Sequence, residues 1–122
     1  MEHKRCIEFP INIKITDEDI SNIISKALDE GGSLHWCYRA STKHSKSIPI
    51  GEVILKGGVV LLHSMDGTTY ELTRDKFITG LQKALPYLDN AIKGINIHTG
   101  SIDVEEADMI IQLALFNELI YD

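Results

Sequence analysis

Cysteine is scarce in this chain of 122 residues, and this scarcity limits what can stabilise the fold. Cys6 and Cys37 allow one disulfide at most, and in a reducing cytosol free thiols are expected. His3 and Cys6 have a familiar metal-ligand spacing, but no second pair follows to complete a tetrahedral zinc site. We therefore expect a fold that depends on neither a metal nor a disulfide, and we predict no cofactor.

Long hydrophobic runs are missing as well. No apolar stretch approaches the ~20 residues of a membrane-spanning helix. The opening residues, MEHKRCIEFP, lack the apolar region of a secretory signal. A chain of this size that is 43% hydrophobic can bury roughly two-thirds of its unfolded surface in one core. We therefore predict one compact domain over residues 1–122 that is cytoplasmic and does not bind membranes.

Basic residues are outnumbered, with 12 Lys and Arg against 18 Asp and Glu, for a net charge of -6. This balance argues against general nucleic-acid binding, which depends on phosphate neutralisation. The charges are also unevenly placed. Residues 102–122 contain six acidic residues and no Lys or Arg, whereas residues 35–46 contain three basic residues, two histidines and no acid. The basic segment suits a small anion, and the acidic one a basic protein surface.

The first half of the chain predicts two strands and a helix. Apolar residues alternate over residues 7–15, which indicates a strand, and Pro10 places that strand at an edge or a bulge. Thr16 caps a helix with acidic residues in its first turn, and Gly31 ends it. The buried stripe of this helix is formed by Ile20, Ile23, Ile24, Ala27 and Leu28. Residues 33–40 indicate a second strand, residues 41–49 a loop, and residues 50–56 either a short helix or an extended segment.

The second half predicts a hairpin and two helices. Residues 59–65 and 68–72 flank Asp66-Gly67, the best hairpin signal in the chain. Thr73 caps a helix that Pro86 ends or kinks, and residues 89–101 indicate a loop. Asp103 and Glu106 form a capping box before the last helix, and residues 119–121 indicate a short strand. These elements predict an α+β fold with a mainly antiparallel sheet and about three helices, and they leave the strand order open.

The chain resembles a known family in five segments, which occur in this order: ITDEDI, ALDEGGSLHWC, KGGVVLL, YELTRDKFITGL and SIDVEEADMIIQLALFNELIY. Together they resemble a family of small, uncharacterised proteins encoded in phages and prophages of Firmicutes. Members commonly have an aromatic residue at the position of His35 and a more acidic loop in place of ASTKHSKSIP. The resemblance implies an accessory factor that acts on host proteins or host defence by binding rather than by turnover.

The basic segment is the first candidate site, because it combines cationic donors with aromatic rings that suit a phosphate and a base. We predict a ligand surface formed by His35, Trp36, Tyr38, Arg39, Lys43, His44 and Lys46. On a regular strand, one face would carry His35, Cys37 and Arg39, and the other Leu34, Trp36 and Tyr38. The alternatives are a solvated basic loop, a core role for Trp36, and a small buried residue at Cys37. Cys37 and His35 would stand about 7 Å apart, too far for an activated nucleophile.

The acidic last helix is the second candidate, a protein-partner surface formed by Glu105, Glu106, Asp108 and Glu118. The alternative is that its first-turn acids stabilise the helix N-terminus. We predict a phage accessory protein, counter-defence or host-modulating, that sequesters a small nucleotide-like ligand or blocks a host protein and is not an enzyme. The alternative is a self-associating phage assembly protein, a homo-oligomer joined through an exposed edge strand.

Overall fold

The computed structural model describes residues 7, 12–28, 34–43 and 48–121, and the α+β class is confirmed. Three short 3-10 turns accompany the helices and strands, at Leu85–Tyr87, Asp89–Ala91 and Thr99–Ser101. The α-helices are α1 (Asp17–Leu28), α2 (Ile50–Leu55), α3 (Arg74–Ala84) and α4 (Val104–Phe116). The strands are β1 (Cys37–Thr42), β2 (Val60–Ser64), β3 (Thr69–Leu72), β4 (Ile92–Lys93) and β5 (Asn96–Ile97).

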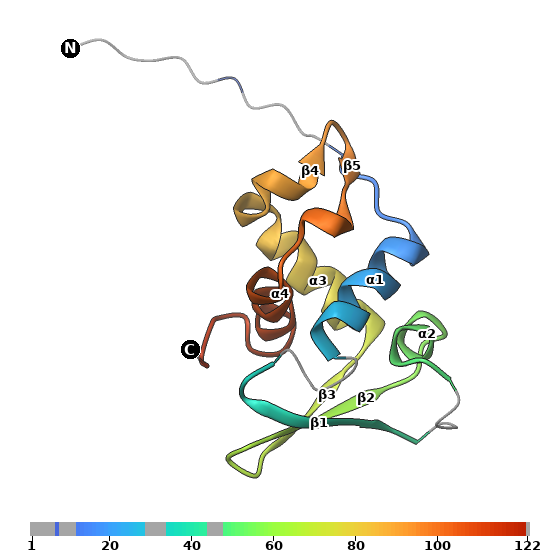
Figure 1. Cartoon of the computed structure of the whole chain (residues 1–122), viewed down its shortest axis with the longest axis vertical. Helices are drawn as coiled ribbons and strands as arrows, with labels where there is room; N and C mark the ends of the chain where they lie inside the picture. Colours follow the sequence, from blue (N-terminus) through green and yellow to red (C-terminus); the bar gives the residue numbers. More distant parts are fainter. Residues whose placement is uncertain (1–6, 8–11, 29–33, 44–47, 122) are drawn as a thin grey trace, which may run out of the picture.

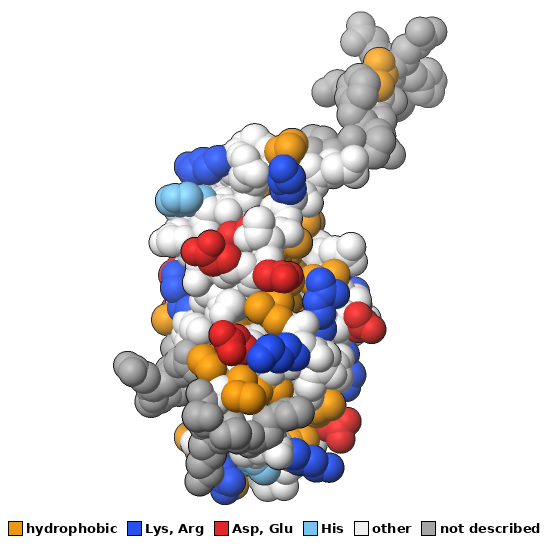
Figure 2. Space-filling model, turned by 90° about the vertical axis from the view of Figure 1, so that its right-hand side faces the viewer, with side chains coloured by type: hydrophobic (Ala, Val, Ile, Leu, Met, Phe, Trp, Pro, Cys, Tyr) orange, Lys and Arg blue, Asp and Glu red, His pale blue; other side chains and the backbone are white. Residues whose placement is uncertain are grey.

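An antiparallel sheet of order β1-β2-β3 lies at one end of the molecule, and helices α1, α3 and α4 pack over one of its faces (Figure 1). The β4–β5 hairpin lies at the opposite end. On the side of α1 and α2, acidic and basic side chains are interspersed at the surface, with hydrophobic side chains between and below them (Figure 2). None of the helices in the described part of the chain is long and apolar enough to cross a membrane.

The core lies between the helices and the inner face of this sheet. The predicted stripe of α1 is buried along its whole length, as the 3.6-residue period requires. Phe77 of α3 and Ile110 of α4 are fully buried beside it, and Leu62 contributes from β2. Burying each such side chain stabilises the fold by about 1.5–3 kcal/mol. Gly80 lets α3 and α4 approach closely, because a Cβ there would lie 2.6 Å from the backbone nitrogen of Ala114.

The predicted helix starts are confirmed by their hydrogen bonds. The backbone amide of Asp19 donates to the Thr16 hydroxyl at 3.1 Å, and the amide of Lys76 donates to the Thr73 hydroxyl at 3.3 Å. At α4 both hydrogen bonds of the capping box form, and in one of them the Glu106 amide donates to the Asp103 carboxylate at 2.7 Å. Pro86 is the second residue after α3 and lies within a 3-10 turn, so the predicted end of that helix is also correct.

Several predicted boundaries are wrong. Residues 34–36 form a turn, in which the Cys37 amide donates to the Leu34 carbonyl at 3.1 Å, so β1 begins later than residue 33. It also runs into the predicted loop, as far as Thr42. The predicted loop at residues 89–101 contains the β4–β5 hairpin, which turns at Gly94 with φ of 65°.

The strands predicted near the two ends of the chain, at residues 7–15 and 119–121, have different outcomes. Residues 119–121 form no strand, because the side chain of Gln112 takes up the amides of Ile120 and Tyr121, each at 2.9 Å. Within the predicted first strand, Lys14 forms a single parallel bridge to Asn96, and residues 8–11 lie outside the described residues.

Candidate functional site

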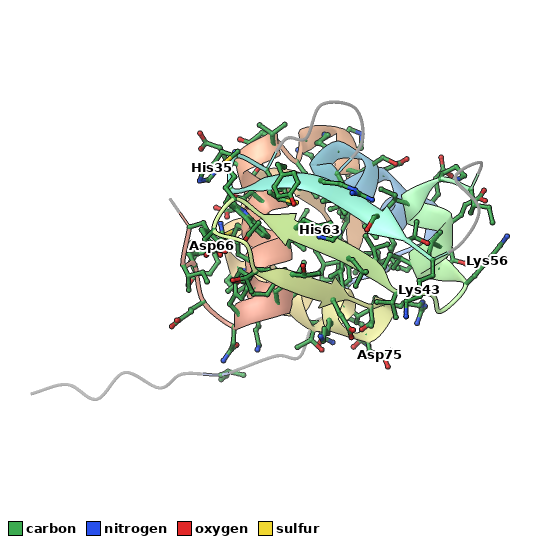
Figure 3. The ribbon with its side chains drawn as sticks, turned by 90° about the horizontal axis from the view of Figure 1, so that it is seen from below. His35, Lys43, Lys56, His63, Asp66 and Asp75 are labelled. Carbon is green, nitrogen blue, oxygen red and sulfur yellow. The ribbon has the colours of Figure 1, made fainter. Side chains whose placement is uncertain are left out.

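One face of the three-stranded sheet is left uncovered by the helices (Figure 3). Along β2, Val60, Leu62 and Ser64 are buried, and the residues between them point to the other side. Residues paired directly across an antiparallel ladder share a face. The register therefore defines an open sheet face formed by Arg39, Ser41, Leu61, His63, Thr69 and Glu71.

His63 occupies the centre of the open sheet face, on the middle strand (Figure 3). Its Nε2 atom lies 2.8 Å from the Ser41 hydroxyl, and its Nδ1 atom lies 3.3 Å from the Thr69 hydroxyl. The ring of Tyr38 lies 6.1 Å away, centroid to centroid. A hydroxyl on each side can donate or accept, so the pair satisfies both ring nitrogens and fixes the plane of the imidazole.

The Ser41–His63 contact has the length of a nucleophile–base hydrogen bond. The third member of this arrangement is the Thr69 hydroxyl, which carries no charge to stabilise an imidazolium as a carboxylate would. Ser41 also lies within β1 in its antiparallel pairing with β2, whereas an oxyanion hole needs donors that converge on one point beside the nucleophile. The open sheet face is therefore better suited to binding than to acyl transfer.

Lys43 stands at the far end of this face, just beyond β1 (Figure 3). It borders a hollow of about 230 Å³ together with Gly58, Val59, Leu61 and Glu71. Sites that enclose a drug-sized ligand have volumes of roughly 300–1,000 Å³. This hollow is therefore large enough for one group of a ligand, whose remainder would extend over the sheet.

The predicted ligand surface is divided by the fold. Tyr38, 64% exposed, lies beside His63, and both Arg39 of β1 and Lys43 directly after the strand are exposed. Trp36 is only 3% exposed, so its ring is not an open stacking platform, and His35 lies near α4 instead. His44 and Lys46 lie outside the described residues.

The predicted alternation of faces from Leu34 to Arg39 is wrong. The turn before β1 places Trp36 and Cys37 in the core as successive residues. A β-bulge follows, because Cys37 pairs with Ser64 while Arg39 pairs with His63, which leaves Tyr38 as the extra residue. Burial raises the pKa of the Cys37 thiol, as expected for a core cysteine rather than a nucleophile. The core alternatives for Trp36 and Cys37 are therefore the ones that fit.

A second cluster, which we call the C-terminal clamp, comprises Trp36, Tyr70, Gln112, Phe116 and Tyr121. The rings of Trp36 and Tyr121 stack 4.7 Å apart with an interplanar angle of 5°. Phe116 meets both rings edge-on. The hydroxyls of Tyr70 and Tyr121 lie 2.9 Å apart. Gln112, 1% exposed, accepts the two tail amides described above and donates to the Tyr121 carbonyl at 2.9 Å. The clamp therefore holds residues 120–121 against the turn before β1.

Asp66 and Tyr121 have shifted pKa values at this cluster. Asp66 accepts hydrogen bonds from the Ser64 hydroxyl, the Thr68 amide at 3.0 Å and the Tyr121 hydroxyl at 3.0 Å. These donors, Ser64 first, hold the pKa of Asp66 at about 2. The hydrogen bond with Tyr70, followed by burial, raises the pKa of Tyr121 to about 12. The ionised carboxylate and the neutral phenol are thus the forms that the fold stabilises.

The predicted acidic partner surface is partly taken up by internal contacts. Asp108 accepts from the Trp36 indole at 2.8 Å and from Gln112 at 3.0 Å, and lies 4.0 Å from His35. Glu106 belongs to the capping box, as the alternative interpretation proposed. Glu105 and Glu118 are exposed. This surface is therefore less available to a partner than the sequence suggested.

Sequence analysis did not identify Ser41, His63 and Thr69 as site residues. The signal was the alternation of the hairpin strands, which places His63 on the outer face once the strand order is known. Comparisons of the chain with known protein families, with curated proteins and with solved structures found no match.

Proposed function

We propose that this protein acts by binding, and that the open sheet face takes an anionic, nucleotide-like ligand. One observation carries the proposal: Tyr38 and Arg39 of β1, and Lys43 directly after it, border the open sheet face around a histidine held by two hydroxyls. Among the residues that the structure describes, no acidic side chain forms an ion pair with Arg39 or Lys43. Their charges remain available to a ligand.

The chemistry of these side chains suits phosphate and a flat ring. Arg39 offers a planar fork of donors that matches phosphate oxygens, whereas Lys43 offers a compact charge. The exposed ring of Tyr38 offers a stacking surface for a base. Lys43 follows Arg39 by four residues and lies directly after the end of β1, so the Cα atoms of the two residues are up to roughly 13 Å apart. These features favour a ligand with two separated polar groups.

The resemblance to phage and prophage proteins supports a biological context for this binding. An accessory protein that sequesters a small nucleotide-like signal inside the host cell would counter a defence that relies on that signal. The exposed cations and the absence of a complete catalytic set in the described residues fit capture better than turnover. We therefore propose a counter-defence or host-modulating role, with the ligand held over β1 and β2.

Isothermal titration calorimetry with ATP and with inorganic pyrophosphate tests this proposal. Loss of one charge-assisted contact costs about 1.5–3 kcal/mol, so Arg39→Ala should weaken binding by at least tenfold. His63→Ala should weaken it several-fold. Lys93→Ala, an exposed cation on the distant β4–β5 hairpin, is the matched control and should leave the affinity unchanged. If neither probe binds, or if Arg39→Ala and Lys93→Ala behave alike, the proposal is wrong.

Mass spectrometry of the intact protein, purified gently from its host or from infected cells, complements the titration. A co-purifying mass in the nucleotide range supports sequestration and identifies the ligand. A bound host protein instead supports the blocking version. A symmetric oligomer carrying nothing supports the alternative of a self-associating assembly protein, for which the two edge strands of the sheet are the available means.

A further inference from the structure

The hydrogen bonds of His63 link its charge to the donors of the open sheet face. Each ring nitrogen contacts a hydroxyl, that of Ser41 at 2.8 Å and that of Thr69 at 3.3 Å. Among the residues that the structure describes, no carboxylate forms an ion pair with this ring. We propose that His63 takes up a proton when the face binds a phosphate group, and that both hydroxyls then donate to that phosphate. This inference rests on the proposed function and adds a regulation by pH to the same site.

The number of hydroxyl protons available to a ligand depends on the charge of the imidazole. A neutral ring has one N–H donor and one bare nitrogen that accepts, whereas a charged ring donates from both nitrogens. Beside a neutral His63, one of the two hydroxyls must therefore direct its proton to the bare nitrogen, and only the other can donate to a ligand. Beside a charged ring both hydroxyls accept, so both of their protons are available.

The positions of the two hydroxyls suit a ligand that lies on the sheet. Thr69 pairs directly with His63 across β2 and β3, and Ser41 is the diagonal neighbour of His63 on β1. The three side chains therefore form a row across the strands on the open sheet face, with His63 at its centre (Figure 3). A terminal phosphate presents three strong acceptor oxygens. It can accept from both hydroxyls and still contact a cation.

The charges around His63 favour protonation only when an anion is bound. Arg39 pairs directly with His63 from β1, and like charges in such a pair are destabilising. Glu71 of β3 is a diagonal neighbour at roughly 7–8 Å, and Tyr38 contributes an aromatic ring from β1. Lys43 adds a positive charge at the end of the face. A phosphate between Arg39 and His63 replaces their repulsion by two attractions, so binding and protonation favour each other.

Isothermal titration calorimetry of the full chain with pyrophosphate, in buffers of different ionisation enthalpy, counts the protons taken up per ligand bound. Histidine ordinarily changes charge near neutral pH, so the count near pH 7 should exceed that of His63→Gln by at least about 0.3 proton. Glutamine keeps a donor and an acceptor but does not become charged. His98→Gln removes an exposed histidine that also contacts a serine hydroxyl, and as the matched control it should leave the count unchanged. Protons taken up by pyrophosphate itself cancel in these comparisons.

Ser41→Ala separates the role of the hydroxyls from that of the charge alone. Near pH 6 the unchanged chain donates from both hydroxyls, so the variant should bind pyrophosphate about fivefold more weakly. Near pH 9 the neutral ring of the variant can adopt the tautomer that donates to Thr69, which leaves one hydroxyl proton available, as in the unchanged chain. The affinity near pH 9 should therefore change by less than about twofold.

Nitrogen NMR of the imidazole rings gives a second readout in the unchanged chain, without any variant that must fold. Saturating pyrophosphate near pH 7 should raise the charged fraction of His63 and leave that of His98 unchanged. Far-ultraviolet circular dichroism checks that the variants are folded. If pyrophosphate binds but the charged fraction of His63 stays the same, or Ser41→Ala has equal effects at both pH values, this inference is wrong and the proposed function stands. If neither pyrophosphate nor ATP binds even near pH 6, both are wrong.

Discussion

Replacing Gln112 by leucine should destabilise the protein more than its position on a helix would suggest. The buried amide of Gln112 makes four hydrogen bonds, three of them to the backbone of Ile120 and Tyr121 and one to Asp108. Leucine keeps much of the volume of the side chain but makes none of these bonds. The variant therefore tests whether one side chain holds the C-terminal tail in place.

The loss in the free energy of unfolding depends on how many hydrogen bonds Gln112→Leu removes and on how exposed their partners are. Four hydrogen bonds at a net ~1 kcal/mol each give an upper limit of about 4 kcal/mol. Ile120 is 46% exposed, so the tail can leave the clamp and return its amides to water, which lowers the cost. We expect a loss of about 2–3 kcal/mol in the free energy of unfolding. Gln82→Leu, at an exposed position of α3, should change stability by less than about 0.5 kcal/mol.

Urea unfolding followed by tryptophan fluorescence measures this directly, because Trp36 is the only tryptophan and its ring stacks on Tyr121. Release of the tail should alter the emission of Gln112→Leu even without denaturant. Combining Gln112→Leu with Tyr121→Ala should cost less than the sum of the two single changes, because both release the same segment. Equal stability of the Gln112 and Gln82 variants, or strict additivity, would refute the clamp.

Two further perturbations have defined outcomes. The pKa of Asp66 is lowered from 3.8 to about 2, so its carboxylate contributes stability that is present above about pH 4 and is lost as the pH falls through 2. The pKa of Tyr121 is raised from 10.0 to about 12, so its contribution to stability is present below pH 10 and is lost between pH 10 and 12. Urea unfolding midpoints measured across pH should therefore fall at both the acid and the alkaline end. Asp66→Asn should reduce the fall at the acid end. Gly80→Ala should cost about 1–3 kcal/mol despite alanine's better helix propensity, because the new Cβ would meet the Ala114 backbone at 2.6 Å. Calorimetric melting should show this loss, and a melting temperature at or above that of the unchanged protein would contradict the close approach of α3 and α4.

Helices α1, α3 and α4 could be predicted from the sequence because their signals are local, whereas the pattern of residues 50–56 left open whether they form the helix α2. The stripe from Ile20 to Leu28, the Thr73 cap and the Asp103–Glu106 capping box each depend on residues within about one or two turns. The hairpin was also predictable, although its turn spans Met65 to Gly67 rather than two residues. Each of these features agrees with the chain's own periodicity, so tertiary packing had no reason to override it.

The sheet and the sites could not be predicted in the same way, because they depend on pairing between distant segments. One extra residue in a strand moves every following side chain to the opposite face. The bulge at Tyr38 reverses the faces in β1 in this way, and no residue type near Tyr38 predicts a bulge. The tail shows the same limitation. Its apolar residues suggested a strand, but the side chain of Gln112 in α4 accepts the amides of Ile120 and Tyr121, which a neighbouring strand would otherwise have paired.

The C-terminal clamp and the open sheet face meet at the start of β1. Trp36 immediately precedes that strand, and its carbonyl accepts the Met65 amide at 2.9 Å, so the clamp fixes β1 against the hairpin turn. The bulge that follows directs Tyr38 outward, and Arg39 then lies on the open sheet face opposite His63. A rigid anchor of this kind is what a binding strand needs, because side chains on an immobilised strand lose less conformational freedom when a ligand arrives. The aromatic cluster around Trp36 therefore has a consequence beyond stability: it sets the direction in which the exposed residues of β1 face a ligand.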